Sequence, residues 1–270
     1  DEMAAILTKI GFIVDEQDNI HVPSFRSDIE HKADIAEEIA RFYGYNKIPV
    51  TQIRGSAEGH LTKAQKFERK VNQTMVALGC YEIMTYSFIS PKYYDKIAMP
   101  AEDKRRQSVT IRNPLGEDTS IMRTTMIPSM LETLSKNYNN RNAAAKMFEI
   151  GNIYLSQGEG KLPVEEPTLA IGIYGDNADF FTLKGIVEQL LAACGVDDVQ
   201  YSAQKENPTF HPGRCADISV KENSLGMMGE IHPVVLENYS IGTKAYVAVL
   251  DLPSMMEHAN MEKQYTPLPK

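Results

Sequence analysis

Four carboxylates near the beginning of the chain have types and spacing that could bind a metal ion. Asp34, Glu37 and Glu38 are spaced i, i+3 and i+4, which places them on one face of a helical turn, and Asp28 precedes them in the entering loop. Carboxylate oxygens are the hard ligands that Mg²⁺ takes. The same pattern suits helix capping, with Asp34 as the N-cap and Glu37 completing a capping box. Spacing alone therefore leaves a magnesium site and an acidic helix start as alternatives.

The elements that would position these carboxylates form a small unit over residues 1–49. Apolar residues at helical spacing predict a first helix over 3–10 and a second over 35–42, and each is followed by a glycine that suits a helix stop. Between them, residues 12–22 predict a β-hairpin with a polar turn. The unit is therefore predicted to be a helix, a hairpin and a second helix, with the carboxylates where the second helix begins.

A larger unit is predicted over residues 61–265, after a polar linker rich in helix breakers at 50–60. It opens on an amphipathic helix. The following segment, 83–88, alternates apolar and polar side chains, which predicts a strand with one apolar face. Two tyrosines of this region, Tyr81 and Tyr86, could line a pocket, but packing in the core is the favoured interpretation, because half-buried tyrosine is common.

The rest of the larger unit alternates predicted strands with a few helices. Residues 110–154 predict a strand, a loop, a helix that can begin at Pro128, and a mostly buried strand. A helix over 180–194 and several further strands follow, at 168–174, 199–203, 215–220, 225–231 and 246–250. Because few helices separate these strands, they should form a mainly antiparallel sheet, and the fold class is α+β.

Composition narrows the class of function. The chain has 43% hydrophobic and 24% charged residues, which is typical of a globular protein, and no apolar run approaches the roughly 20 residues of a membrane span. A net charge of −8 argues against a surface that grips nucleic acid throughout. Basic runs at 63–70 and 104–106 are interpreted as a solvated helix face and a polar loop. Three well-separated cysteines favour a reducing, cytoplasmic compartment.

Other common chemistries find no support in the sequence. The six histidines do not fall in a metal-ligand spacing such as HxxxH, which argues against zinc. No GxSxG, P-loop or GxGxxG motif occurs, so serine hydrolysis and motif-based nucleotide binding lack support. His211 and Arg214 flank a Pro-Gly turn, where they could bind an anion or form a structural corner.

Several segments of the chain carry a resemblance to a known family. Near the start, the chain contains VPSFRSDIEHKADIAEEIARFYGYNKIP. In the larger unit it contains IRNPLGEDTSIMRTTMIPSMLETLSKN followed by KMFEIGNIY, and later HPGRCADI, GEIHP and VAVLDL. Together these resemble the β subunit of bacterial-type phenylalanine-tRNA ligase, over essentially all 270 residues. The resemblance implies a winged-helix-like domain at 1–49 and an inactive class II aminoacyl-tRNA synthetase-like core, an antiparallel sheet with flanking helices, at 61–265. Residues 266–270 look like the lead into an anticodon-binding domain, so we expect the chain to be an excised fragment.

The local sequence agrees with a loss of catalysis. A working motif 2 of class II synthetases carries, after its EIG-type turn, an Arg that clamps the α-phosphate of ATP and a companion Glu. Counted from Glu149, these positions fall at Leu155 and Gln157, and neither side chain can bind a phosphate as a charge. No strand ending in Gly-x-Glu-Arg, the motif 3 arrangement, occurs later, and Pro212-Gly213-Arg214 lacks the Glu.

The resemblance also implies partners and ligands. It matches Asp28, Asp34, Glu37 and Glu38 to the positions that the family uses for a Mg²⁺ shared with the catalytic α subunit, although the ion could be absent without that partner. It implies a heterotetramer of two α and two β subunits, which binds tRNA as the full enzyme. Part of the subunit contact is predicted at residues 123–134, in particular at Arg123, Thr124, Met130 and Leu134.

The sequence therefore predicts a scaffold within an enzyme: a non-catalytic part of the β subunit, inactive by itself, that supports an α subunit attaching phenylalanine to its tRNA with ATP. Two alternatives from other classes remain. One is a free-standing class II-like adenylating enzyme, against which the degenerate motif 2 counts. The other is a tRNA-binding module, against which the acidic balance counts.

Overall fold

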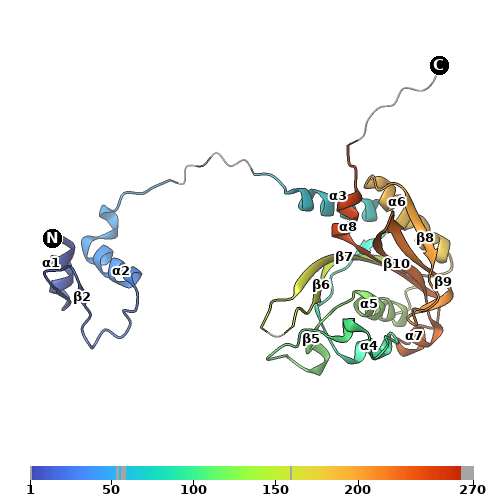
Figure 1. The fold of residues 1–270 in the computed structure, drawn as a ribbon, viewed down its shortest axis with the longest axis horizontal. Helices are drawn as coiled ribbons and strands as arrows, with labels where there is room; N and C mark the ends of the chain where they lie inside the picture. The colour runs from blue at the N-terminus through green and yellow to red at the C-terminus, as the bar shows by residue number, and fades with distance from the viewer. Residues whose placement is uncertain (1, 53–54, 56–58, 159, 263–270) are drawn as a thin grey trace, which may run out of the picture. The chain divides into compact units, whose positions relative to one another are not determined.

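The computed structural model describes residues 2–52, 55, 59–158 and 160–262. The chain divides into two compact units, Asp1–Gly59 and His60–Lys270 (Figure 1). The predicted linker at 50–60 lies partly outside the described residues, and the predicted lead into a further domain at 266–270 lies wholly outside them.

The first unit consists of helix α1 (Glu2–Lys9), a hairpin of β1 (Ile13–Val14) and β2 (Ile20–His21), and helix α2 (Lys32–Tyr43), followed by the 3-10 turn η1 (Tyr45–Lys47). The predicted order of helix, hairpin and helix is confirmed. Gly11 ends α1 with a φ of +93°, a left-handed conformation that glycine adopts without strain. Leu7 and Phe12 are the fully buried apolar side chains of this unit's described residues, so its core is small.

The second unit is built on a seven-stranded sheet with the order β3-β6-β7-β11-β10-β9-β8. Every neighbouring pair is antiparallel except β3 with β6, which confirms the predicted, mainly antiparallel sheet. The strands are β3 (Tyr81–Glu82), β6 (Ala145–Leu155), β7 (Val164–Tyr174), β8 (Val199–Ala203), β9 (Phe210–Val220), β10 (Asn223–Ile231) and β11 (Ala245–Asp251). A separate two-stranded sheet pairs β4 (Phe88–Ile89) with β5 (Ile121–Met122).

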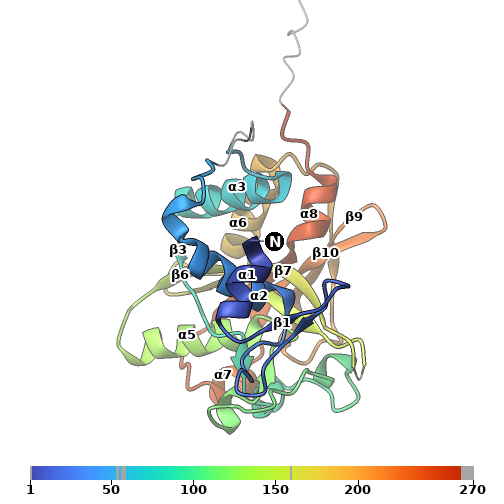
Figure 2. The ribbon, with the colours of Figure 1, turned by 90° about the vertical axis from the view of Figure 1, so that its left-hand side faces the viewer.

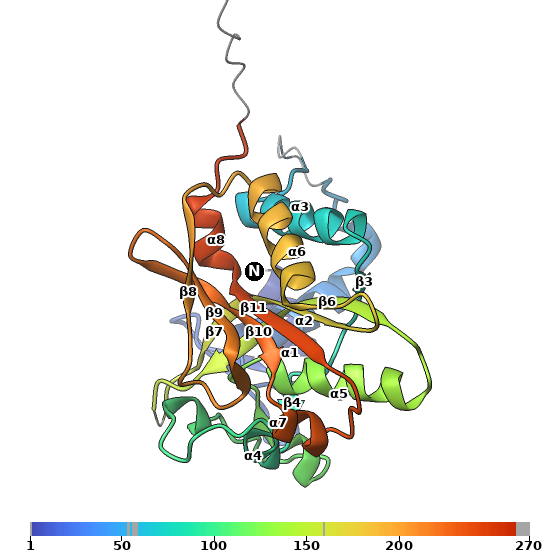
Figure 3. The same cartoon turned by 90° about the vertical axis from the view of Figure 1, so that its right-hand side faces the viewer.

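Helices cover both faces of the large sheet, as Figures 2 and 3 show. On one face lie α3 (Lys63–Ala77), α6 (Phe180–Ala193) and α8 (Leu252–His258). On the other lie α4 (Lys92–Lys96), α5 (Ile127–Asn139) and α7 (Pro233–Asn238), with the short turns η2 (Lys104–Arg106) and η3 (Glu117–Thr119) in the connecting loops. Among the described residues, none of the helices combines the length and apolar character needed to cross a bilayer.

The central strand β7 explains how α5 reaches the sheet. Its residues from Thr168 to Tyr174 are all buried, because a strand covered by helices on both faces has no solvated side. A Cβ atom added at Gly172 would lie 2.5 Å from Sδ of Met130 and 3.0 Å from Cδ1 of Leu134. Glycine at this position therefore allows α5 to pack directly on the strand.

The segment between β3 and β4 differs from the sequence prediction. Tyr81 and Tyr86 are exposed by 75% and 81%, and Met84 by 95%. The prediction that the two tyrosines pack in the core is therefore wrong. The reason is position, since Tyr81 lies in β3, an edge strand of the large sheet, and Tyr86 lies in the loop that leads from β3 to β4.

Candidate functional site

The acidic cluster of the first unit is organised by the start of α2. The helix begins at Lys32 with His31 as its N-cap, so Asp34 is the third helical residue. Its Oδ2 atom accepts the backbone N–H groups of Glu30 at 2.9 Å and His31 at 2.7 Å. These bonds lower the pKa of Asp34. The prediction that Asp34 is the N-cap is wrong, and the capping role falls to its side chain reaching back across the helix start.

Two arginines hold the other members of the cluster. Arg26 donates from Nε to Oδ1 of Asp28 at 2.9 Å and from Nη2 to Oδ2 at 2.6 Å, and the same Nη2 reaches Oε1 of Glu38 at 3.0 Å. Arg41, one turn further along α2, donates to Oε2 of Glu38. These pairs lower the pKa of Asp28 to about 2, through Arg26, and lower that of Glu38, through Arg26 and then Arg41.

The arrangement does not fit a magnesium ion as it stands. Glu38 is buried between two guanidinium groups, Asp28 is paired through both oxygens, and Asp34 is committed to the helix start. Glu37 is exposed and has no hydrogen bond or ion pair with the described residues. Across the described parts of the chain, no group of three or more His, Cys, Asp or Glu side chains could hold a metal ion. Arg26 and Arg41 were missed in the sequence. The i, i+3 spacing of Glu38 and Arg41 could have revealed that pair, whereas Arg26 is two residues from Asp28 and twelve from Glu38, which no helical spacing connects.

The residues predicted to contact a partner subunit lie inside the second unit. Arg123 and Thr124 precede α5, and Met130 and Leu134 lie on its sheet-facing side; all four are at most 2% exposed. A side chain buried in its own chain cannot contact a partner's surface, so a direct contact through these four is a mistaken prediction. Met130 and Leu134 are buried because Gly172 lets α5 pack its apolar stripe on β7, and Arg123 is buried against Glu149.

Arg123 instead belongs to a buried polar network behind an exposed segment. Its guanidinium donates to Asn152 O at 2.9 Å, to Thr85 Oγ1 at 2.8 Å and to Glu149 Oε1 at 3.2 Å. Thr85 in turn donates from Oγ1 to Glu149 Oε2 at 2.7 Å. The backbone N–H of Arg123 also donates to Ser87 O at 2.9 Å. The network therefore fixes residues 85–87 against the core.

The exposed side of that segment is apolar. Met84, Tyr86 and Phe88 project outward, and they line a cavity of about 670 Å³ together with residues of α5 and of η3. Contiguous exposed apolar side chains beside a cavity are typical of a surface that binds a protein partner. The alternation of apolar residues in the sequence predicted an apolar face in this segment. That this face is exposed to solvent follows from its position after the edge strand β3.

The two positions expected to have lost ATP-binding side chains lie at the end of the β6–β7 hairpin. Leu155 is the last residue of β6, half-buried, and pairs with Val164. Gln157 is exposed and donates from its amide to Leu162 O at 2.9 Å. Neither offers a charge to a phosphate, and Gln157 is used to close the turn.

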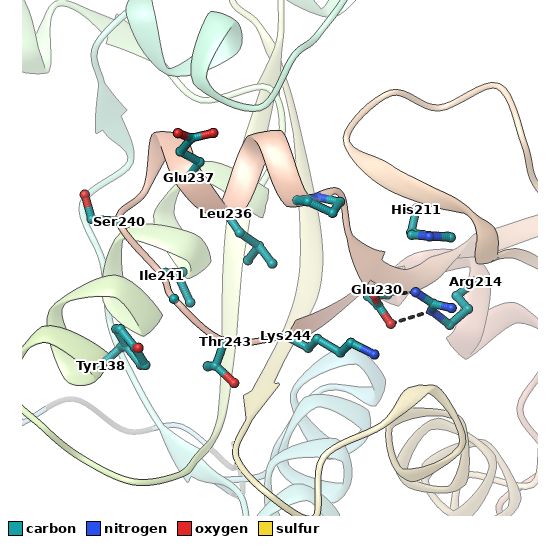
Figure 4. Close-up of a pocket in the computed structure, with 12 residues that line it drawn as sticks. Tyr138, His211, Arg214, Glu230, Leu236, Glu237, Ser240, Ile241, Thr243 and Lys244 are labelled. Carbon is teal, nitrogen blue, oxygen red and sulfur yellow. Dashed lines mark hydrogen bonds and ion pairs between the residues drawn. The ribbon is translucent and has the colours of Figure 1, made fainter.

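A cavity of about 780 Å³ lies between β9, β10, α7 and the loop before β11 (Figure 4). Arg214 forms a two-bonded ion pair with the buried Glu230, at 2.5 and 2.7 Å. Burial opposes ionisation of Glu230, but the bonds from Arg214 outweigh it and its pKa is lowered. Lys244 extends toward the same pair and His211 lies beside it. Arg214 is thus held by an internal carboxylate, which favours the structural corner over an anion site.

Comparisons with known proteins point to one family over most of the chain. The model of the phenylalanyl tRNA synthetase beta chain CLM domain matches residues 48–252, and that of the tRNA synthetase B5 domain matches residues 1–45. The phenylalanine–tRNA ligase beta subunit of Clostridium acetobutylicum is 46% identical over 250 residues, which is 92% of this chain and 31% of that protein. The corresponding subunit of Clostridium tetani is 48% identical over 254 residues, 93% of this chain and 32% of that protein. The chain thus spans about a third of the length of these relatives.

One solved structure has a similar fold over much of the chain. The pyrrolysyl tRNA synthetase PylSc of Desulfitobacterium hafniense superposes with a TM-score of 0.57 at 16% identity, over 71% of this chain and 64% of that one. At this identity the likeness establishes the α+β fold and nothing further. With the family model covering most of the sequence, the chain belongs to the phenylalanyl-tRNA synthetase beta chain family.

Proposed function

We propose that this chain is a non-catalytic part of the β subunit of a phenylalanine–tRNA ligase, and that it scaffolds a catalytic α subunit which attaches phenylalanine to tRNA with ATP. The observation that carries the proposal is the exposed apolar strip of Met84, Tyr86 and Phe88, which runs from the loop after the edge strand β3 to the start of β4. The absence of a phosphate-binding charge at Leu155 and Gln157 supports a non-catalytic role, since ATP would need such a cation there.

The docking surface for the α subunit is this strip together with its adjoining cavity. Class II folds commonly pair through a helix and a strand, and here α3 leads directly into β3 and the strip. Of the four residues first predicted for this contact, Arg123 acts from behind it: together with Glu149 it holds Thr85, so that Met84 and Tyr86 face outward on a fixed backbone. A rigid, preorganised surface loses less entropy when a partner binds.

The assembly would be a heterotetramer of two α and two β subunits that binds tRNA as a whole. The first unit, a helix–hairpin–helix module, is proposed to be winged-helix-like. A Mg²⁺ shared with the α subunit is proposed at Asp28, Asp34, Glu37 and Glu38, and it would require these carboxylates to rearrange from the pairs described above. A cytoplasmic location is supported by three buried cysteines that are free thiols.

The test uses the complete β subunit and its α subunit. Met84→Asp and Tyr86→Asp each place a charge on the strip without touching the core, so we expect α-subunit binding to weaken by at least about 30-fold, the effect of a strong interface residue. Leu162→Asp is the matched control, because Leu162 is similarly exposed at the β6–β7 turn and does not line the cavity beside the strip. The affinity between the two subunits is measured by surface plasmon resonance with one subunit immobilised. Aminoacylation by the assembled enzyme should fall in parallel.

Unchanged affinity in both strip variants would refute docking at this edge. Pyrophosphate exchange with ATP and phenylalanine, measured on this chain alone, tests the competing view of a free-standing adenylating enzyme, and exchange above background would overturn the scaffold role. Retention of the isolated chain on tRNA at physiological salt would instead favour a tRNA-binding module.

A further inference from the structure

The cavity beside the exposed strip has an aromatic wall. Tyr86 and Phe88 of the strip line it together with Tyr93 of α4, and its volume of about 670 Å³ leaves room for a side chain from another molecule. The ring of Tyr93 meets that of Tyr239 edge to face, with the two centroids 6.5 Å apart, so Tyr93 is held in place. Because the faces of aromatic rings carry partial negative charge, such a wall attracts cations.

Two carboxylates lie at the same cavity. Glu132 is half-buried on α5 and Asp118 is exposed in η3, and both line the cavity. Across the described residues, neither carboxylate takes part in a hydrogen bond or an ion pair. Burial raises the pKa of Tyr93, and the charges of Glu132 and Asp118 raise it further. Both carboxylates therefore lie close to the aromatic wall.

Neighbouring groups of the chain do not neutralise this negative charge. Lys136 follows Glu132 by one turn of α5 and lines the cavity, but no ion pair joins the two in the part of the chain that the structure describes. Lys96 lies outside the lining, with Nζ 5.3 Å and 4.9 Å from the ring centroids of Tyr93 and Tyr239. Burial and then the charge of Glu132 raise the pKa of Tyr239, yet its buried hydroxyl donates to none of the described residues. The cavity is thus acidic and lacks a cation of its own.

We propose that this cavity receives a positively charged side chain of the docking α subunit, by preference an arginine. The proposal rests on the proposed function, which supplies the partner, and adds the chemistry of the contact. A guanidinium suits the cavity because it stacks on aromatic faces and binds carboxylates through a planar set of N–H donors. Glu132 gains more from such a partner than an exposed carboxylate does, because it is already partly removed from water.

The main test measures the affinity of the complete β subunit for the α subunit by surface plasmon resonance. Glu132→Gln keeps the shape of the side chain and removes its charge, so we expect affinity to fall about tenfold, the loss of one charge-assisted hydrogen bond. Asp118→Asn, at an exposed position outside α5, should lower it about threefold, and it guards against a folding defect in the helix variant. Glu117→Gln is the matched control: Glu117 is paired with Lys92 at 3.0 Å and does not line the cavity, so affinity should change by less than about twofold.

A small probe tests the cavity without the α subunit. N-acetyl-arginine amide is titrated into the 270-residue chain, and the amide signals of Thr85 and Thr133, which line the cavity, are followed by NMR. We expect millimolar binding to the unchanged chain, and binding at least about fivefold weaker to Glu132→Gln, because the cation then faces the aromatic wall with one carboxylate fewer. The uncharged N-acetyl-glutamine amide should leave both signals in place.

Several results would overturn the proposal: unchanged affinity of Glu132→Gln for the α subunit, an equal loss in Glu117→Gln, or a probe that binds the unchanged chain and Glu132→Gln alike. Weaker binding by the strip variants Met84→Asp and Tyr86→Asp, with no change in Glu132→Gln, would leave docking at the strip standing and refute cation binding alone. A probe that discriminates while no variant affects the α subunit would show a cation site with another occupant, which overturns the assignment of the partner.

Discussion

Gly151→Ala provides a direct test of the buried network that supports the docking strip. Gly151 lies in β6 beside the guanidinium of Arg123, and a Cβ atom there would be 2.3 Å from Nη2 of Arg123 and 3.2 Å from Oε1 of Glu149. Real Cβ atoms do not approach so closely, so the guanidinium has to move. It cannot move freely, because it is buried and bonded to Asn152 O, Thr85 Oγ1 and Glu149.

The expected loss of stability can be estimated in two ways. If Arg123 shifts but keeps its partners, the cost is that of overpacking a core, about 1–3 kcal/mol. If the pair with Glu149 breaks, the cost is that of leaving a buried charge unpaired, about 3–5 kcal/mol. We therefore expect the free energy of unfolding of the second unit to fall by about 3 kcal/mol, which corresponds to a urea midpoint lowered by roughly 1 M.

Far-UV circular dichroism in urea measures the effect, and Gly185→Ala is the control. Gly185 lies inside α6 with no atom within 4 Å of an added Cβ, so the same substitution should stabilise the chain by about 0.5–1 kcal/mol through helix propensity. If Gly151→Ala unfolds at the same urea concentration as the unchanged chain, Arg123 is not held as described, and the support of the strip has to be reconsidered.

Three further predictions concern pH, thiols and ATP. The pKa of Asp28 is lowered to about 2, and the pKa values of Asp34 and Glu38 are also lowered. The stability that these carboxylates contribute is therefore present above their unfolded pKa values near 4 and is lost as the pH falls from there toward 2. The amide signals of α2 in NMR spectra should disappear in this range, and their persistence at pH 2 would contradict the role of these pairs. Burial raises the thiol pKa to about 11 or 12, so at pH 8 reaction with a thiol reagent should be roughly a hundredfold slower in the folded than in the urea-unfolded chain, for Cys80, Cys194 and Cys215. Leu155→Arg restores one charge of an ATP site but not its partners, so pyrophosphate exchange by the chain alone should stay at background, and any gain would show that the site is closer to function than its sequence implies.

Much of the fold could be predicted because it follows from local patterns. The apolar run of β7 and the helical spacing in α3 and α5 specify their elements directly. The long β6–β7 hairpin and the antiparallel sheet follow from strands that succeed one another with few helices between them. The first residue of α2 was harder to predict from the sequence. The helix has His31 as its N-cap, so Asp34 is its third residue and not the N-cap.

The candidate site was less predictable, because it depends on which charges meet. An arginine is normally exposed, and Arg123 was expected at a subunit contact; a carboxylate 26 residues away, Glu149, makes it a buried residue. Conversely, apolar Met84 and Tyr86 were expected on or near a core, and they are exposed because they lie in the loop that follows the edge strand β3.

The sequence by itself determined the family, the order of helices and strands, the acidic cluster, and the lack of charged side chains at Leu155 and Gln157. Each of these depends on residues that lie close together in the chain. Only the tertiary structure decided that Arg26 and Arg41 occupy the carboxylates, that α5 faces inward, and that the strip beside β3 faces outward. These outcomes depend on ion pairs and packing between segments distant in sequence, whose free energy no local pattern contains.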